Sequence, residues 1–386
     1  MGVWDASRRG MKPAVLKRVE FFAESLAGIC AGALVAPGRP LRWIVIANPT
    51  AGGFILRSRW ERHRLALTRQ AGVGTPRPAC RPADASSGFG NLPSLAAHGL
   101  VATENAGSGT KIAEALVDEA AAGDPGVFYL VVVAGGDGTS LEVLSVLYRA
   151  PESVRSNVAV LRLPMGTGND GADSPDLAKA LDLLIKPSRV ELAPAIRLLP
   201  APGGGLATKG PFIAFNVLSV GIDAFITHMT NKMKKKSPGD FYKLWVDVAA
   251  LLYGALYTVG FLDVRAPGGR GEEAIAFREK LLLIAVGASG RRTYGSRKRI
   301  LPDERNVCAL RQMPLLRKLA LKGPLAKGLH AGQPEARMFS ARRVEISGEH
   351  PILAQTDGET VLLRKEDFPA VIELTEPAIP VLKALG

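Results

Sequence analysis

An apolar run that leads directly into a glycine-rich turn constrains this chain more than any other feature. Residues 131–134 predict a buried strand, residues 135–139 read Gly-Gly-Asp-Gly-Thr, and residues 140–147 have the apolar spacing of a helix. Glycine lets the backbone approach a phosphate closely, and a helix N-terminus favours an anion. The segment therefore predicts a phosphate-binding turn, with an ordinary strand-to-helix turn as the alternative.

Two further predicted strands end in turns of the same kind. Residues 41–47 lead into an Asn-Pro-Thr-Ala-Gly-Gly turn, and residues 158–164 lead into a turn at 166–170. In an open parallel sheet, ligands bind outside the carboxyl ends of the strands. Three such turns at one edge predict a site large enough for a nucleotide, and no Walker-type phosphate loop is present.

Composition limits the class of protein and its partners. An apolar fraction of 47% with 22% charged residues excludes a disordered chain, and 386 residues favour two domains. The three cysteines have neither metal nor disulfide spacing, which favours a reducing compartment. A net charge of +13 indicates an anionic partner. Because aromatics are few and no nucleic-acid module is evident, we expect nucleotide phosphates and an anionic membrane surface, and no nucleic acid.

The distribution of strand-like and helical segments along the chain predicts its domain organisation. Residues 1–40 predict an N-terminal helical extension packed on the body, with an interfacial membrane helix or a cleaved signal as alternatives. Residues 41–188 alternate strands and helices and predict an α/β domain. Residues 189–374 contain strand-like runs between glycine and proline turns, which predict an antiparallel sandwich or barrel; the tail at about 375–386 could return to the first domain.

One apolar segment of the second half has a helical pattern. Residues 240–262 approach the length of a membrane span, but Asp247 lies within them. We expect a helix packed on the second domain rather than a span.

The ordered motifs resemble those of the diacylglycerol kinase catalytic domain superfamily, which includes sphingosine and ceramide kinases. The resemblance rests on the turn at 48–52, the turn at 135–139 with Glu142, the turn at 166–170, residues 215–224 and the late Asp-Gly-Glu at 357–359. It implies an α/β N-terminal domain with a Rossmann-like parallel sheet of the NAD kinase and diacylglycerol kinase type, followed by a C-terminal antiparallel β-sandwich domain that takes the lipid.

The resemblance also implies an activity and a site between the two domains. The expected reaction is ATP- and Mg²⁺-dependent phosphorylation of a hydroxyl on a diacylglycerol-like or sphingoid lipid. The residues expected to hold ATP are Asn48, Pro49, Thr50, Ala51, Gly52, Thr103, Gly135, Gly136, Asp137, Gly138, Thr139, Glu142, Gly166, Thr167, Asn169 and Asp170. Asp137 would act through Mg²⁺, and Glu359 would be the general base, with Asp357 as the alternative carboxylate. For Glu142 and Asp170, a structural role is as open as a contact with the ligand. Residues 357–359 could also simply form a hairpin turn.

Departures from the family pattern leave alternatives open. Residues 301–307 lack the Asp-Asp-Gly turn that binds a structural Mg²⁺ in some members, and residues 171–173 read Gly-Ala-Asp where an apolar residue, Ala and Arg are usual. The basic loop at 290–299 would contact a lipid phosphate or an anionic membrane, or be solvated. An NAD kinase-like enzyme and a non-catalytic nucleotide- or lipid-binding homologue are the alternative functions. We expect a cytoplasmic protein at the inner face of the membrane, and a homodimer is open.

Overall fold

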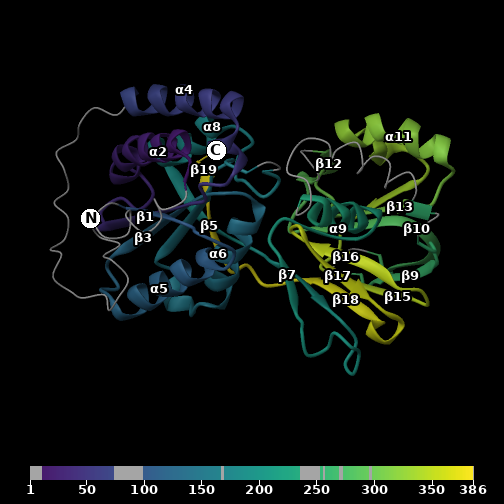
Figure 1. The fold of residues 1–386 in the computed structure, drawn as a ribbon. Helices are drawn as coiled ribbons and strands as arrows, with labels where there is room; N and C mark the ends of the chain where they lie inside the picture. The colour runs from purple at the N-terminus through teal and green to yellow at the C-terminus, as the bar shows by residue number, and fades with distance from the viewer. Residues whose placement is uncertain are drawn as a thin grey trace. The chain divides into compact units, whose positions relative to one another are not determined.

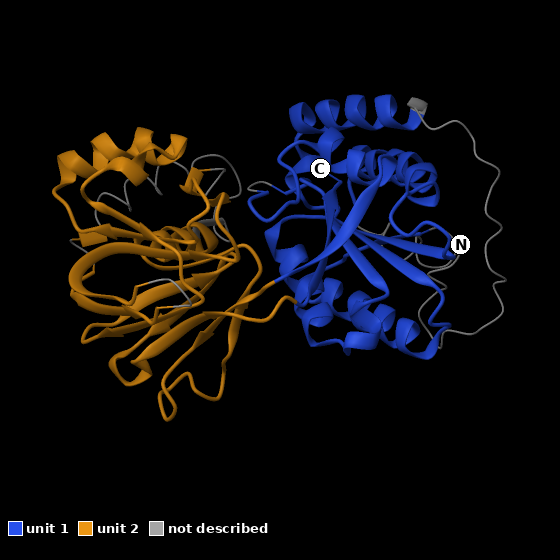
Figure 2. Cartoon of the chain, turned by 180° about the vertical axis from the view of Figure 1, so that it is seen from behind, with its two compact units in different colours: residues 1–193, 378–386 blue, residues 194–377 orange. Residues whose placement is uncertain are grey.

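The structure is a computed structural model that describes residues 11–73, 99–166, 169–234, 253–254, 257–268, 273–294 and 298–385. The chain divides into two compact units (Figure 1, Figure 2). The first unit comprises Met1–Ala193 with Ala378–Gly386, and the second comprises Pro194–Pro377.

The first unit is built on a six-stranded sheet in the order β2-β1-β3-β4-β19-β5. Its strands are β1 (Leu41–Ala47), β2 (Leu100–Ala102), β3 (Phe128–Ala134), β4 (Val158–Arg162), β5 (Ser188–Ala193) and β19 (Ile379–Ala384). Neighbouring strands are parallel except for β5, which is antiparallel to β19. Every residue of β3 is buried, as its continuous apolar run predicts.

Helices cover both faces of this sheet (Figure 1). They are α2 (Pro13–Ala31), α3 (Gly52–Ile55), α4 (Arg57–Val73), α5 (Ser108–Ala122), α6 (Asp137–Arg149), α7 (Glu152–Arg155) and α8 (Leu177–Ile185). α2, α4 and α8 pack together on one face, and α5 packs beside α6 on the other. This arrangement leaves the carboxyl ends of the parallel strands at one edge.

The N-terminal extension is a helix whose apolar side chains belong to the core of the first unit. Phe22, Leu26 and Cys30 of α2 are fully buried, and the ring of Phe22 lies 5.1 Å from the ring of Phe54, centroid to centroid. α2 therefore uses its apolar residues for packing. Within the described stretches, no helix combines the length and apolarity needed to cross a bilayer.

The second unit is antiparallel and strand-rich. Its strands are β6 (Ile196–Leu199), β7 (Phe212–Ala214), β8 (Val217–Gly221), β9 (Phe261–Ala266), β10 (Ile275–Gly287), β11 (Arg292–Tyr294), β12 (Lys298–Leu301), β13 (Val307–Arg311), β14 (Ala336–Phe339), β15 (Arg343–Gly348), β16 (Ile352–Thr356), β17 (Glu359–Leu363) and β18 (Ala370–Leu374). Its helices include α9 (Ile222–Lys234) and α11 (Leu315–Lys327), and the short 3₁₀ segments are η1 (Leu329–Gly332) and η2 (Lys365–Asp367).

Eleven of these strands form one bonded sheet, because β10 runs through both halves of it. The first half of β10 pairs with β9, and the second half pairs with β8 and β13. The predicted combination of a parallel α/β domain and an antiparallel second domain is confirmed, and the second domain is a half-barrel sheet in which the two layers are continuous.

The division between the units lies slightly later than the boundary that we placed near residue 188. β5 pairs with β19 along its whole length and so belongs to the first sheet. Residues 188–193 look like a strand of either domain in sequence, and only the returning tail decides between them. Most of the predicted helix at 240–262 lies outside the described residues.

Candidate active site

The turns after β1, β3 and β4 lie against one another at the carboxyl edge of the first sheet. The backbone N–H of Asn48 donates to the carbonyl of Ala134 (3.0 Å), and its Nδ2 donates to Oγ1 of Thr139 (3.2 Å). The N–H of Gly53 donates to the carbonyl of Met165 (2.7 Å). Three segments that are distant in sequence therefore share one rim.

Asn48 also organises the first turn internally. Its Oδ1 accepts hydrogen bonds from the N–H of Thr50 (3.0 Å) and from the hydroxyl of Thr50 (2.7 Å). Pro49 is buried and Thr50 is exposed, while Ala51 precedes α3 and Gly52 begins it. Asn48 thus fixes the turn through its own side chain, as short polar residues do in tight turns.

The second turn opens α6 and is packed too tightly for side chains at its first position. A Cβ on Gly135 would lie 2.6 Å from the Cβ of Thr139. Gly136 precedes α6 in an extended conformation, and a Cβ on Gly138 would meet no heavy atom within 4 Å. The first amides of a helix lack partners within the helix and favour an anion, so this end of α6 has the geometry for a phosphate.

Asp137 is the first residue of α6 and ties this helix to the third turn. Its Oδ1 accepts a hydrogen bond from the N–H of Gly171 (2.9 Å), directly after Asp170. Asn169 is buried with φ of +59°, and its amide donates to the carbonyl of Pro164 (2.9 Å). Thr167 lies outside the described residues, so its expected contact with ATP stays a prediction.

Glu142 and Thr103 hold the loop that follows β2. The two carboxylate oxygens of Glu142 accept the N–H groups of Gly107 (2.8 Å) and Gly109 (2.9 Å) at the start of α5. The N–H of Thr103 donates to the carbonyl of Ala47 (2.7 Å). Glu142 therefore has a structural role, whether or not a nucleotide lies beside it. Thr103 lies next to the first turn.

Two features of this rim were missed in the sequence. Nη1 of Arg59 on α4 donates to the carbonyl of Gly166 (2.8 Å). Arg162, at the end of β4, forms a buried ion pair with Asp173 (2.6 Å, side chains 7% and 3% exposed). Asp173 stands where the family pattern usually has an arginine, so the unusual residue is explained by a partner eleven positions earlier in the chain.

The late Asp-Gly-Glu motif forms the tip of the β16–β17 hairpin in the second unit. Asp357 (φ +46°) and Gly358 (φ +103°) occupy a two-residue turn in the left-handed region, which suits Asp-Gly. The carboxylate of Asp357 accepts the N–H groups of Phe215, Asn216 (3.1 Å) and Val217 (3.0 Å). Glu359 opens β17 and is exposed. Asp357 is an anchor, whereas Glu359 is accessible.

A buried polar network supports this hairpin from below. Oε1 of Gln355 accepts the N–H of Gly358 (3.0 Å), and Nε2 of Gln355 donates to Oγ of Ser219 (2.9 Å). Ser219 donates in turn to Asp223 on α9 (2.7 Å). Asn231 on α9 donates to the carbonyl of Gly358 (2.8 Å). The position of Glu359 is therefore set by contacts on both sides of the turn.

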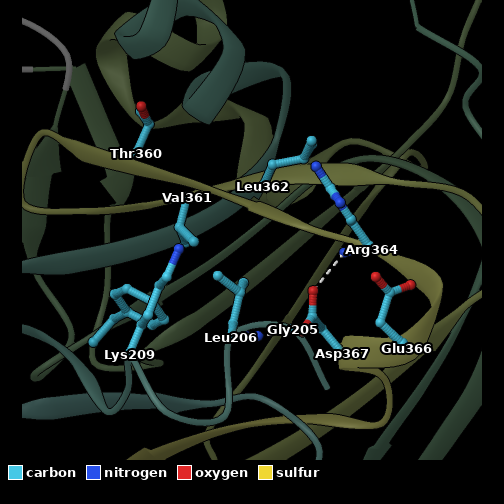
Figure 3. Close-up of a pocket in the computed structure, with 10 residues that line it drawn as sticks. Gly205, Leu206, Lys209, Thr360, Val361, Leu362, Arg364, Glu366 and Asp367 are labelled. Carbon is cyan, nitrogen blue, oxygen red and sulfur yellow. Dashed lines mark hydrogen bonds between the residues drawn. The ribbon is translucent and has the colours of Figure 1, made fainter.

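A pocket of about 400 Å³ runs along β17 from Thr360, the residue after Glu359 (Figure 3). Asp367 holds its wall together, because its carboxylate accepts the N–H groups of Arg364 (2.9 Å) and Leu206 (2.9 Å). The remaining lining residues are Gly205, Lys209, Phe212, Val361, Leu362 and Glu366. The pocket therefore lies within the second unit, beside the strand that Glu359 begins.

Metal ligands are sparse in the part of the chain that the structure describes. No group of three or more His, Cys, Asp or Glu side chains there could hold a metal ion. Mg²⁺ commonly binds through one or two carboxylates together with substrate phosphates, so Asp137 alone fits a nucleotide-borne ion. In the 301–307 segment, hydrogen bonds from Arg305 lower the pKa of Asp303. The carboxylate of Asp303 is therefore paired with Arg305. This agrees with the absence from residues 301–307 of the Asp-Asp-Gly turn that binds a structural Mg²⁺ in some members.

The sequence-family model of the diacylglycerol kinase catalytic domain matches residues 42–192, which contain all three turns. This segment belongs to the diacylglycerol kinase catalytic domain family. The expected superfamily is thereby confirmed. In the first unit, this catalytic domain is completed by the returning strand β19.

The similarity to known proteins extends beyond the catalytic domain. A probable lipid kinase YegS-like of Yersinia enterocolitica is 25% identical over 277 residues, which cover 66% of this chain and 81% of the relative. Its counterpart from Pectobacterium atrosepticum is 27% identical over 260 residues, covering 64% and 78%. A crystal structure of a diacylglycerol kinase from Bacillus anthracis matches with a TM-score of 0.52 at 16% identity, covering 90% of this chain and 98% of that one. This last likeness is one of fold.

Proposed function

We propose that this protein is an ATP- and Mg²⁺-dependent lipid kinase that phosphorylates a hydroxyl of a diacylglycerol-like or sphingoid lipid. The observation that carries the proposal is the shared rim of three turns around Asp137, within a diacylglycerol kinase catalytic domain. Phosphoryl transfer needs mainly positioning and charge stabilisation, and a rim of backbone amides beside one carboxylate supplies both.

In this proposal, the first unit binds the nucleotide. The turn amides and the N-terminus of α6 would bind the phosphates, and Asn48 would keep the first turn in shape. Asp137 would hold Mg²⁺, which when bound neutralises charge on the phosphates. Because Gly171 donates to Asp137, the third turn would also orient this carboxylate.

The second unit would provide the general base and the lipid site. Glu359 is accessible and would accept the proton of the acceptor hydroxyl, whereas Asp357 would keep the hairpin in place. Because a long-chain acceptor resides in a bilayer and the chain carries a charge of +13, the proposal includes peripheral binding to the anionic inner face of the membrane.

The test is transfer of labelled γ-phosphate from ATP to a panel of diacylglycerol, sphingosine, ceramide and NAD. We expect a labelled lipid, and loss of at least about 100-fold in rate in Asp137→Asn. Asp118→Asn, on the exposed side of α5, is the matched control and should keep full activity. Labelling of NAD alone would support the NAD kinase-like alternative. ATP binding without transfer to any acceptor would contradict a kinase and indicate a binding homologue.

A further inference from the structure

The helix α11 exposes three of its five leucines. Leu315, Leu316 and Leu319 are 49%, 81% and 47% exposed, and Leu316 is the most exposed large hydrophobic residue in the described part of the chain. Leu329 in η1, just after the helix, is 61% exposed. A surface helix normally turns its apolar residues to the core, so this outward placement needs a reason.

The inner side of α11 is already satisfied by the second unit. Leu321 is buried with Met313 in an apolar cluster that also contains Phe225 of α9 and Leu353 of β16. Arg317 pairs with Glu335 (2.7 Å). Figure 1 shows α11 lying along the outside of the second unit. Leu321 and Arg317 therefore hold the helix on the second unit.

The segment that carries these leucines has charged residues of one sign. Residues 313–330 contain four lysine and arginine residues and no acidic residue. Lys322 and Lys327 are exposed, and at helical spacing they border the stripe formed by Leu315, Leu316 and Leu319. Arg299 on β12, which packs beside α11, is also exposed. A helix that served only solubility would carry both signs, whereas leucines bordered by lysines match an anionic lipid surface.

We propose that the outer face of α11, defined by Leu315, Leu316, Leu319, Lys322 and Lys327, docks on the anionic leaflet of a membrane. The leucines enter the boundary between headgroups and acyl chains, and the lysines contact the lipid phosphates. The inference deepens the proposed lipid kinase and rests on it for its purpose. The binding itself requires no turnover, so the two can be tested separately.

The test is co-sedimentation of the full chain with vesicles, without ATP. We expect binding to vesicles of phosphatidylcholine with phosphatidylglycerol, and much weaker binding to phosphatidylcholine alone. Leu316→Glu combined with Leu319→Glu should weaken binding at least tenfold. Leu65→Glu on α4, where Leu65 is 54% exposed, is the matched control and should bind as the wild type does. Equal binding by the double variant and the wild type would overturn the proposal.

A second pair of variants tests the charge. Lys322→Gln combined with Lys327→Gln should weaken binding to the anionic vesicles and reduce its dependence on salt, whereas Lys111→Gln on α5, which is also exposed, should do neither. An unchanged salt dependence would contradict the assigned role of the lysines. If the leucine variant instead converted a dimer into a monomer in sedimentation velocity, the face would be a contact between copies and the proposal would fall.

Kinase assays separate this proposal from the function on which it rests. The leucine double variant should lose activity toward an acceptor in vesicles and keep it toward the same acceptor dispersed in detergent. Equal loss in both assays would contradict a docking role. A wild type that binds the anionic vesicles but transfers no phosphate to any lipid would refute the kinase and leave the docking face supported.

Discussion

Gly166 and Gly136 pack backbone against backbone, since a Cβ on Gly166 would lie 2.5 Å from the Cα of Gly136. The contact joins the turn after β4 to the residue that precedes α6. It explains why position 166 requires glycine, whereas a Cβ on Gly136 would lie 3.5 Å from the Cα of Gly166, which is an ordinary contact. The shape of the proposed phosphate site therefore depends on missing side chains as much as on those present.

Gly166→Ala should destabilise the first unit by about 1–3 kcal/mol, because one backbone segment must move to make room. Chemical denaturation measures this change. Gly138→Ala is the matched control, because a Cβ there meets no heavy atom within 4 Å. Its free energy of unfolding should not fall. Equal stability of the two variants would show that the close contact does not constrain the turns.

The same control variant tests whether a nucleotide approaches α6. Gly138 is exposed in the first turn of this helix, where the proposed triphosphate would lie against the backbone. We expect Gly138→Ala to weaken ATP binding at least tenfold in calorimetry, although its fold is intact. Unchanged ATP affinity would exclude this helix end as the phosphate site.

Substitutions of Glu359 and Asp357 should have different effects on turnover and stability. Glu359→Gln should lower turnover by about 100-fold or more, with little change in stability, because an exposed base is lost. Asp357→Asn should lower the free energy of unfolding by about 1.5–3 kcal/mol, because the carboxylate accepts three backbone amides. Denaturation and labelled-phosphate transfer together separate them. Full turnover in Glu359→Gln would remove it as the base.

The sequence allowed the first sheet and its turns to be predicted because each signal was local. The apolar run of β3 and the glycines after it are contiguous, and parallel strands bring such turns to one edge. The tip of the β16–β17 hairpin was predicted as a turn because Asp-Gly suits left-handed backbone. In these cases, the residues that determine the local backbone and the residues that suggest the chemistry lie in the same short segment.

What could not be predicted depends on partners far away in the chain. For Glu142 the sequence left a ligand contact and a structural role equally open, and only the fold shows that its carboxylate accepts amides 33 and 35 positions earlier in the chain. β5 looked like the start of the second domain until β19 returned to pair with it. Only the folded chain brings these pairs together.

The buried pair of Arg162 and Asp173 should be sensitive to the loss of one partner. Asp173→Ala leaves a guanidinium that is 7% exposed without its carboxylate, so we expect about 3–5 kcal/mol of destabilisation. Arg162→Met combined with Asp173→Leu should cost less than Asp173→Ala alone. Glu304→Ala removes the partner of Arg291 from a pair that is 69% and 79% exposed, and should cost less than about 1 kcal/mol. Similar losses at both sites would show that burial does not set the cost.

His330 should make the second unit sensitive to mild acid. It is fully buried, its Nε2 lies 3.0 Å from the carbonyl of Ile300, and burial lowers its pKa below the ordinary 6.5, with a smaller opposing effect of the Ile300 carbonyl. Below pH 6.5 the unfolded chain binds a proton that the folded chain does not. The contribution of this residue to stability is therefore complete above pH 6.5 and falls as the pH drops toward the folded-state pKa, by up to ~1.4 kcal/mol per pH unit.

His330→Gln should reduce this loss, because glutamine can still donate to Ile300 but does not titrate. Free energies of unfolding measured between pH 7.5 and 5.5 should decrease more in the wild type than in the variant. His350→Gln, at an exposed position, is the control and should follow the wild type. The window ends above the range in which most carboxylates take up protons, so their effect on the comparison is small. Parallel curves for wild type and His330→Gln would mean that another group governs the acid sensitivity of this unit.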